Sequence, residues 1–426
     1  MIHELTASEA AARIRAGELT SEALVGACLA RIDAREAEVG AWQHVARDQA
    51  LDEAREADRS SPRGPLHGVP IGVKDIIDTV DMPTTLGSSL YAARRPQWDA
   101  ACVAAARAAG AIVLGKTVTT EFACFEQGKT RNPHDLRRTP GGSSSGSAAA
   151  VADFMVPIAF GSQTAASVIR PAAFCGVLGY KASFGELSLS GIRPLAESLD
   201  TLGILARSVA DIALLRSVLL AGPHRAEVTP LPAPPKIGVC RTAQWTLAER
   251  SSQMAIEACA ECFRRAGARV SDVALPAQFA AVIDAQKTIM VYEAAHNYIF
   301  ETTRFAHLLS ASFRAFCEAG SQVSREDYSS ARHTVAFASA ELTAVFADYD
   351  ALITPAAIGE APLAQAGTGD PVMSRMWTAL RVPSLAVPMA KGPQGLPVGV
   401  QLIAAERADD RLLQVGQWVT QALAAM

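Results

Sequence analysis

Short apolar runs alternate with longer helical patterns along most of the chain. Apolar runs of strand length occupy residues 70–74, 111–115, 156–160, 236–240, 351–354, 384–388 and 398–403, and residues 269–273 are also predicted to form a strand. Segments with the spacing of helices occupy residues 100–109, 207–220, 248–266 and 409–424. Strands that alternate with helices predict an α/β fold around a mainly parallel sheet.

Two long segments lack this alternation. Residues 6–58 are alanine-rich and are predicted to be helical, and residues 278–346 are predicted to be mostly helical. The chain has 426 residues, of which 50% are hydrophobic, so it is long enough for one large core or two domains.

Charge and hydropathy exclude some classes of partner. The net charge is −4, so there is no basic footprint for nucleic acid. No segment approaches the ~18 uninterrupted apolar residues of a membrane span, and the N-terminus lacks the pattern of a signal peptide. We therefore expect a cytoplasmic protein without a nucleic-acid or membrane partner.

Eight cysteines are scattered along the chain. Scattered cysteines in a large chain without a secretion signal indicate reduced, buried thiols. Cys259 and Cys262 have Cys-x-x-Cys spacing, but they lie inside a helical pattern and no second pair stands nearby. A redox or metal role is the weaker alternative, and we expect neither a metal nor a cofactor.

Three small-residue motifs carry the candidate chemistry. Residues 139–150 pack glycine and serine together and then turn into an alanine run, residues 68–75 form an apolar strand that delivers Lys74, and residues 161–171 place Ser167 among small residues. Close apolar flanks argue against a flexible linker at 139–150. A phosphate loop would need a closing Gly-Lys-Ser/Thr, which is absent.

These motifs together resemble the amidase signature family. Gly141–Ser147, Lys74-Asp75 and residues 395–403 match its motifs in the right order, and the likeness is weakest between residues 240 and 348. The resemblance implies one α/β/α domain over residues 1–426 around a large mixed sheet. Residues 65–207 would form the signature core, and residues 240–348 a variable, substrate-shaping, mostly helical region.

The resemblance also implies a Ser–Ser–Lys triad that cleaves a small-molecule amide through an acyl-enzyme. Carried over by position, the nucleophile is Ser167, the bridging residue is Ser143 and the base is Lys74; Ser143 would follow a cis peptide bond. A serine hydroxyl needs a base to take its proton. A lysine serves as that base if burial lowers its pKa, and Lys74 follows an apolar run.

The oxyanion hole of the family corresponds to Thr164, Ala165, Ala166 and Ser167. Preorganised N–H donors at such a site stabilise the tetrahedral intermediate. Most members carry Gly-Gly where this chain has Ala165-Ala166. Either the backbone angles there suit alanine, or the hole is shifted and activity is narrowed or weakened.

Arg170 has two interpretations of equal weight. It lies three residues after Ser167, an arrangement that resembles the malonamidase-like branch. Its guanidinium can bind a substrate carboxylate, or it can pin the loop to a carboxylate such as Glu121 or Asp200.

A competing motif is the nucleophile elbow of α/β-hydrolases, which Gly142–Gly146 matches with Ser144 as nucleophile. The elbow needs an apolar strand before it, whereas residues 131–140 are polar and broken by proline. We therefore favour the triad.

Three functions remain open. The favoured one is a stand-alone hydrolase of a small amide, with a homodimer allowed for. The second is the amidase subunit of a tRNA-dependent amidotransferase, which normally has a longer chain and a glycine pair before the nucleophile. The third is a catalytically weakened binding homologue, which rests on Ala165-Ala166 alone.

Overall fold

The computed structural model describes residues 1–124, 126–220 and 227–425. The described strands are β1 Trp42–Val45, β2 Pro70–Lys74, β3 Ile112–Thr117, β4 Ile158–Gln163, β5 Leu178–Lys181, β6 Thr201–Ala206, β7 Lys236–Cys240, β8 Arg269–Val273, β9 Ala351–Pro355, β10 Ser384–Lys391 and β11 Pro397–Ile403. The described α-helices are α1 Ala7–Arg15, α2 Ser21–Val39, α3 Arg47–Arg59, α4 Ala101–Ala108, α5 Ser145–Ala152, α6 Ile169–Cys175, α7 Val209–Leu219, α8 Arg250–Arg265, α9 Val282–Asn297, α10 Ile299–Arg304, α11 Ala311–Ser321, α12 Arg325–Val345, α13 Val372–Ala379 and α14 Asp409–Ala424.

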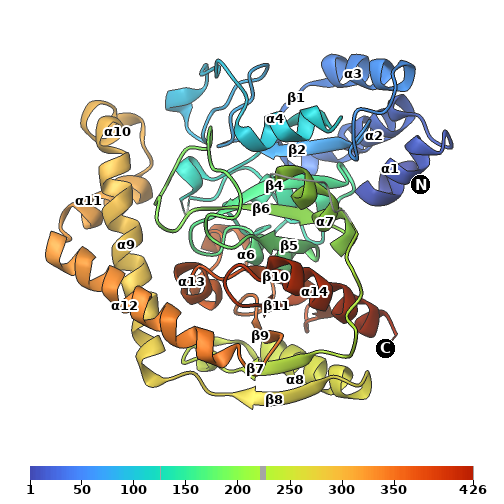
Figure 1. Ribbon diagram of the computed structural model, residues 1–426. Helices are drawn as coiled ribbons and strands as arrows, with labels where there is room; N and C mark the ends of the chain where they lie inside the picture. The colour runs from blue at the N-terminus through green and yellow to red at the C-terminus, as the bar shows by residue number, and fades with distance from the viewer. Residues whose placement is uncertain (125, 221–226, 426) are drawn as a thin grey trace.

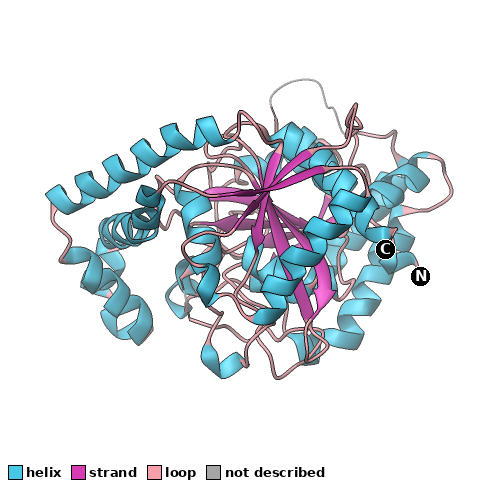
Figure 2. Ribbon diagram, turned by 90° about the horizontal axis from the view of Figure 1, so that it is seen from below, coloured by secondary structure: helices cyan, strands magenta, loops and turns pink. Residues whose placement is uncertain are grey.

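All the described strands join one twisted sheet with helices on both faces (Figure 2). The strand order is β1-β3-β2-β4-β6-β5-β10-β11-β9-β7-β8. Helices α9 to α12 form a separate helical wall on one side of the sheet, opposite the N-terminal helices (Figure 1). The predicted α/β fold with a large mixed sheet is confirmed.

The expectation of a mainly parallel sheet is wrong. Six of the ten described strand pairings are antiparallel and four are parallel. Antiparallel neighbours need only short connections, as in the β10–β11 hairpin, whereas parallel neighbours need long crossovers. The antiparallel strands β5 and β6, as well as β1, are absent from the sequence-based prediction.

The elements that carry the motifs lie next to each other in the sheet. Strand β2 pairs in parallel with both β3 and β4, so the residues that follow β2 and β4 emerge at the same edge. These strands are buried along their whole length, which agrees with their continuous apolar character. The sheet therefore brings Lys74, at the end of β2, beside the segment that leads from β4 to Ser167.

The other sequence-based expectations concern cysteines and membranes. All eight cysteines are buried, as predicted, and Cys259 and Cys262 lie within α8. None of the described helices is long and apolar enough to span a membrane.

Candidate active site

Lys74 is the last residue of β2, and its side chain is fully buried. Its Nζ donates hydrogen bonds to Ser143 Oγ at 2.7 Å and to Ser162 Oγ at 2.9 Å. The contact with Ser143 joins two of the three predicted triad residues directly.

Burial gives this lysine the protonation behaviour of a base. Desolvation lowers the pKa of Lys74 to about 7, although the nearby Asp200 carboxylate acts in the opposite direction. A buried ammonium loses its hydration, so the neutral amine is favoured. At neutral pH a large fraction of Lys74 is therefore able to accept a proton.

Asp75 takes no part in this cluster. It points away from Lys74 and accepts hydrogen bonds from Thr85, and its carboxylate lies 3.3 Å from Lys116 Nζ. Successive strand residues face opposite sides of the sheet, which accounts for the separation.

Ser143 follows two glycines, Gly141 and Gly142, at positions where a side chain would come too close to neighbouring residues. The Gly142–Ser143 peptide is cis, as the family resemblance implies, and Gly141 has a left-handed φ of 80°. A Cβ on Gly141 would lie 2.9 Å from Pro171 Cα, and one on Gly142 would lie 2.8 Å from Thr368 Cγ2. The glycine pair thus lets the loop pass close to α6 and to residues 368–369 while it presents Ser143 to Lys74.

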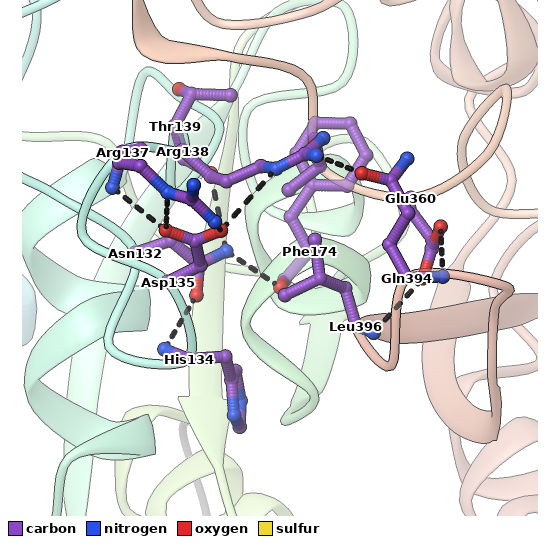
Figure 3. A network of polar contacts seen from close by, with 11 residues as sticks. Asn132, His134, Asp135, Arg137, Arg138, Thr139, Phe174, Glu360, Gln394 and Leu396 are labelled. Carbon is purple, nitrogen blue, oxygen red and sulfur yellow. Dashed lines mark hydrogen bonds and ion pairs between the residues drawn. The ribbon is translucent and has the colours of Figure 1, made fainter.

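A polar network fixes the chain just before this loop (Figure 3). The Asn132 side-chain amide donates to Thr139 O at 3.1 Å and to Phe174 O at 2.9 Å. Arg138 donates to Ala361 O at 2.7 Å and to Gln394 Oε1. The polar, proline-containing segment that argues against a nucleophile elbow is therefore an anchored loop.

Ser167 follows β4 and is buried to all but 8% of its surface. Its carbonyl oxygen accepts a hydrogen bond from Ser144 N at 3.2 Å, which ties the segment of the predicted nucleophile to the Gly/Ser loop. Its hydroxyl makes no hydrogen bond with any described residue. The structure thus brings the two serine segments together, without a direct bond between the hydroxyls of Ser143 and Ser167; such catalytic contacts commonly tighten only when substrate binds.

The backbone before Ser167 is the segment predicted to form the oxyanion hole. The carbonyl of Thr164 accepts from Gln286 Nε2 at 3.0 Å, that of Ala165 from Thr378 Oγ1 at 2.7 Å, and that of Ala166 from Arg170 N at 3.0 Å. The N–H groups of Ala165, Ala166 and Ser167 donate to none of the described residues. The C=O and N–H groups of one trans peptide unit point in opposite directions. The hydrogen bonds to these three carbonyls therefore leave the N–H groups of the same peptide units available as donors.

Alanine fits this segment without strain. Neither Ala165 nor Ala166 is among the described residues with positive φ. Of the two alternatives raised by the missing glycine pair, the backbone angles therefore support the first, in which they suit alanine. Gln163 holds the turn further, because its Oε1 accepts from Val168 N at 2.9 Å and from Ile169 N at 3.0 Å.

Arg170 is almost fully buried, and its guanidinium contacts neutral oxygens. It donates to Gly142 O at 2.7 Å, to Thr368 Oγ1 at 3.1 Å and to Gly369 O. It forms no described ion pair with Glu121 or Asp200, the two carboxylates considered above. Burial, and then the charge of Arg375, lower the pKa of Arg170 to about 9. These contacts tie α6 to the loop that carries Ser143.

A cavity of about 310 Å³ has Ser162, Thr164 and Asp200 in its wall. Ser162 connects it to Lys74, because its Oγ accepts the hydrogen bond from Lys74 Nζ. Asp200 is buried and accepts hydrogen bonds from Thr164 Oγ1 and from Leu195 N and Ala196 N. Burial raises the pKa of its carboxyl group to about 7. Sequence reasoning missed Ser162 and Asp200 as site residues; the signal for Ser162 was its place at the end of a strand parallel to that of Lys74.

The competing candidates have structural contacts. Ser144 Oγ bonds both the carbonyl and the N–H of Ser162, at 3.3 and 3.2 Å. His67 contacts Ala57 O, and His134 contacts Cys175 O, so neither ring bonds a motif serine. Among the described residues, no cluster of three or more His, Cys, Asp or Glu side chains is arranged to hold a metal ion.

Comparisons with known proteins show which family this chain resembles. A family model described as Amidase matches residues 23–413. A glutamyl-tRNA(Gln) amidotransferase subunit of Salinispora tropica is 34% identical over 96% of this chain and 95% of its own. A structure described as an amidase superposes with a TM-score of 0.91 at 30% identity, covering 98% of this chain and 100% of the other.

Two further solved structures bear on function. The peptide amidase of Stenotrophomonas maltophilia has a TM-score of 0.85 and 31% identity over 99% of this chain and 97% of its own. A chain from a vestigial protein complex, described as revealing the evolutionary origins of an s-triazine catabolic enzyme, has a TM-score of 0.89 and 27% identity over 98% of each chain. The chain belongs to the amidase family and is an amide-cleaving enzyme.

Proposed function

We propose that the protein hydrolyses a small-molecule amide through a Lys74–Ser143–Ser167 triad. The observation that carries this proposal is the fully buried Lys74, whose lowered pKa and 2.7 Å hydrogen bond to Ser143 suit it to accept a proton at neutral pH. No other base among the described residues bonds the serines of the motifs.

The first half of the reaction forms an ester on Ser167. The Ser167 oxygen attacks the amide carbonyl carbon while its proton passes to Ser143 Oγ, and Ser143 gives its own proton to Lys74 Nζ. The N–H groups of Ala165, Ala166 and Ser167 then face the negative oxygen of the tetrahedral intermediate. When the C–N bond breaks, the proton on Lys74 returns through Ser143 to the leaving nitrogen.

The second half releases the acid. Water attacks the ester carbonyl and passes its proton to Lys74 along the same route. Collapse of the second tetrahedral intermediate breaks the bond to Ser167 Oγ, which takes the proton back. The cycle consumes one amide and one water and needs no cofactor or metal.

A second candidate is the amidase subunit of a tRNA-dependent amidotransferase, which works only inside a complex. The curated relatives carry the name of such a subunit, so they support this alternative better than the stand-alone hydrolase. The alignment with the Salinispora tropica protein runs over 471 positions against 426 residues here, in line with the shorter chain. The homodimer and the single-domain boundaries stay predictions.

Arg170 is proposed to hold the active-site loop. Its three contacts with neutral oxygens support loop pinning over carboxylate binding, although by partners other than those first considered.

One assay separates the two candidates. The purified chain alone is incubated with a panel of small amides, ureas, carbamates and esters, and ammonia or amine release is compared with that of the Ser167→Ala variant. Turnover of small amides by the single chain supports the hydrolase. Turnover that appears only when a partner protein is added favours the amidotransferase, and turnover by Ser167→Ala equal to wild type would refute the triad.

A further inference from the structure

The cavity beside Lys74 combines apolar walls with a fixed positive charge. Arg193 lines the same cavity of about 310 Å³ as Ser162 and Thr164. Much of the remaining wall is apolar and is formed by Ile76, Leu189, Ile192, Pro194 and Leu195. Small-molecule sites are built in this way, with apolar walls that hold the ligand and a few polar groups that orient it.

Contacts with α9 and α10 and with Tyr298 between them hold the Arg193 side chain in place. Its Nη2 donates to Glu301 Oε1 at 2.7 Å and to Asn297 O at 3.3 Å, and its guanidinium lies 4.8 Å from the centroid of the Tyr298 ring. The Tyr91 hydroxyl donates to the same Glu301 oxygen at 2.6 Å. A guanidinium fixed before the ligand arrives loses little conformational freedom on binding.

Part of this guanidinium is free to bind a ligand. Both hydrogen bonds just described use Nη2, and Nη1 makes no hydrogen bond with any described residue. A guanidinium carries five N–H donors, so binding to Glu301 does not exhaust it.

Two acidic residues, Asp200 and Glu197, also line the cavity. Their surroundings weaken the repulsion that they would exert on an anion bound by Arg193. The Asp200 carboxylate accepts from Thr164 Oγ1 and from two backbone N–H groups, which offset its charge. Glu197 is exposed to solvent, where water screens its charge. A carboxylate that enters the cavity therefore meets Arg193 as its ionic partner.

We propose that Arg193 binds a carboxylate at the far end of the substrate's acyl chain. The apolar residues that line the cavity together with Arg193 would contact the methylene groups that separate this carboxylate from the scissile amide. This proposal rests on the proposed amide hydrolysis and names its substrate class: half-amides of dicarboxylic acids with several methylene groups, such as glutaramate and adipamate.

The length of the substrate's acyl chain distinguishes a carboxylate site at Arg193 from the carboxylate site considered above at Arg170. Arg170 lies three residues after Ser167 and contacts the residue before Ser143, so a carboxylate bound there would have to sit close to the reacting carbonyl. That geometry would favour malonamate, which has a single methylene group. Selection by Arg193 instead favours adipamate over malonamate.

The experiment compares kcat/KM for adipamate, malonamate and the neutral hexanamide. Charge-assisted hydrogen bonds predict that Arg193→Met lowers the adipamate-to-hexanamide ratio by about ten- to a hundredfold. Arg193→Lys should recover part of the loss, since a point charge keeps attraction but not the fork. Arg304→Met, which removes an exposed arginine from the same helix as Glu301, should keep the wild-type ratio.

Two control experiments separate effects on folding and on catalysis from effects on binding. Removing Arg193 leaves the buried Glu301 carboxylate without its cation, so the double variant Arg193→Met/Glu301→Gln tests the site with that charge also removed. Adipate binding to Ser167→Ala, measured by calorimetry, needs no turnover. Adipate binding that Arg193→Met weakens supports the site even if amide hydrolysis fails.

Three results would overturn the proposal. The first is an adipamate-to-hexanamide ratio that Arg193→Met leaves unchanged. The second is an absence of adipate binding in a Ser167→Ala variant that is folded. The third is a preference for 6-aminohexanamide over adipamate, which would make Glu197 the selecting group and the substrate a cation.

Discussion

Replacing Lys74 by methionine tests the protonation state on which the proposed mechanism depends. The pKa of Lys74 lies near 7 in the folded protein, against an ordinary value of 10.5, and burial is the main cause. The unfolded chain therefore binds more protons between these two values, and the free energy of unfolding of the wild type rises with pH in that window. Methionine fills a similar volume and does not titrate.

The magnitude follows from the same two pKa values. Each tenfold difference in proton affinity is worth about 1.4 kcal/mol. The buried lysine thus destabilises the wild type by roughly 4 kcal/mol at pH 7 and by roughly 2 kcal/mol at pH 9. Lys74→Met removes this destabilisation, but it also loses the hydrogen bonds to Ser143 and Ser162, which lowers its stability by the same amount at both pH values. The stability difference between Lys74→Met and wild type should therefore be about 2 kcal/mol larger at pH 7 than at pH 9.

Denaturant unfolding at the two pH values measures this difference. Lys236→Met is the matched control, because Lys236 is an exposed strand lysine and its replacement should give the same stability difference at both pH values. A Lys74→Met difference that does not change between pH 7 and pH 9 would refute the reasoning, because Lys74 would then be protonated alike in the folded and unfolded states. In the same variant, amide turnover should fall by about 10²–10⁴-fold.

Three further predictions concern the residues around Lys74. The kcat/KM of the wild type should rise with pH and level off above about 7 as Lys74 loses its proton. Asp200→Asn should move this rise to lower pH, because the Asp200 charge raises the pKa of Lys74. A rise at the same or higher pH in Asp200→Asn would count against an electrostatic effect of Asp200 on Lys74. Ser143→Ala should abolish most turnover, whereas Ser144→Ala and Ser145→Ala should keep a measurable part of it, since the Ser144 hydroxyl bonds only backbone groups of Ser162; an acyl group trapped on Ser144 would revive the nucleophile elbow. Arg170→Ala should lower the melting temperature and reduce turnover of acidic and neutral amides alike, because its contacts hold the Ser143 loop; a loss confined to acidic substrates would make Arg170 the carboxylate clamp.

The sequence predicted those parts of the molecule that depend on local pattern. Strands β2 and β7 coincide with their predicted apolar runs, because a buried strand needs only a short continuous apolar stretch. Strand β8 also has its predicted bounds, although it is partly exposed at the end of the sheet. Strand β1 was hidden within the alanine-rich segment at residues 6–58, and β5 and β6 lie in segments that show no strong alternation. Their place in the sheet depends on pairing with distant strands, which local pattern does not encode.

The site shows the same division. Lys74, Ser143 and Ser167 lie in motifs that can be recognised from their small-residue surroundings. Asp200 enters the cavity wall from a loop between β5 and β6, and Arg193 from the same loop, so neither has a local signal. The contacts that fix the oxyanion segment come from Gln286 on α9 and Thr378 on α13, which are more than a hundred residues away along the chain.

The most direct measurement is mass spectrometry of the intact protein during turnover of a slowly hydrolysed amide or ester. The account predicts an added acyl mass on the wild type, located by peptide mapping to Ser167, and no such mass on Ser167→Ala. An acyl group on any other residue, or steady turnover by Ser167→Ala, would contradict it.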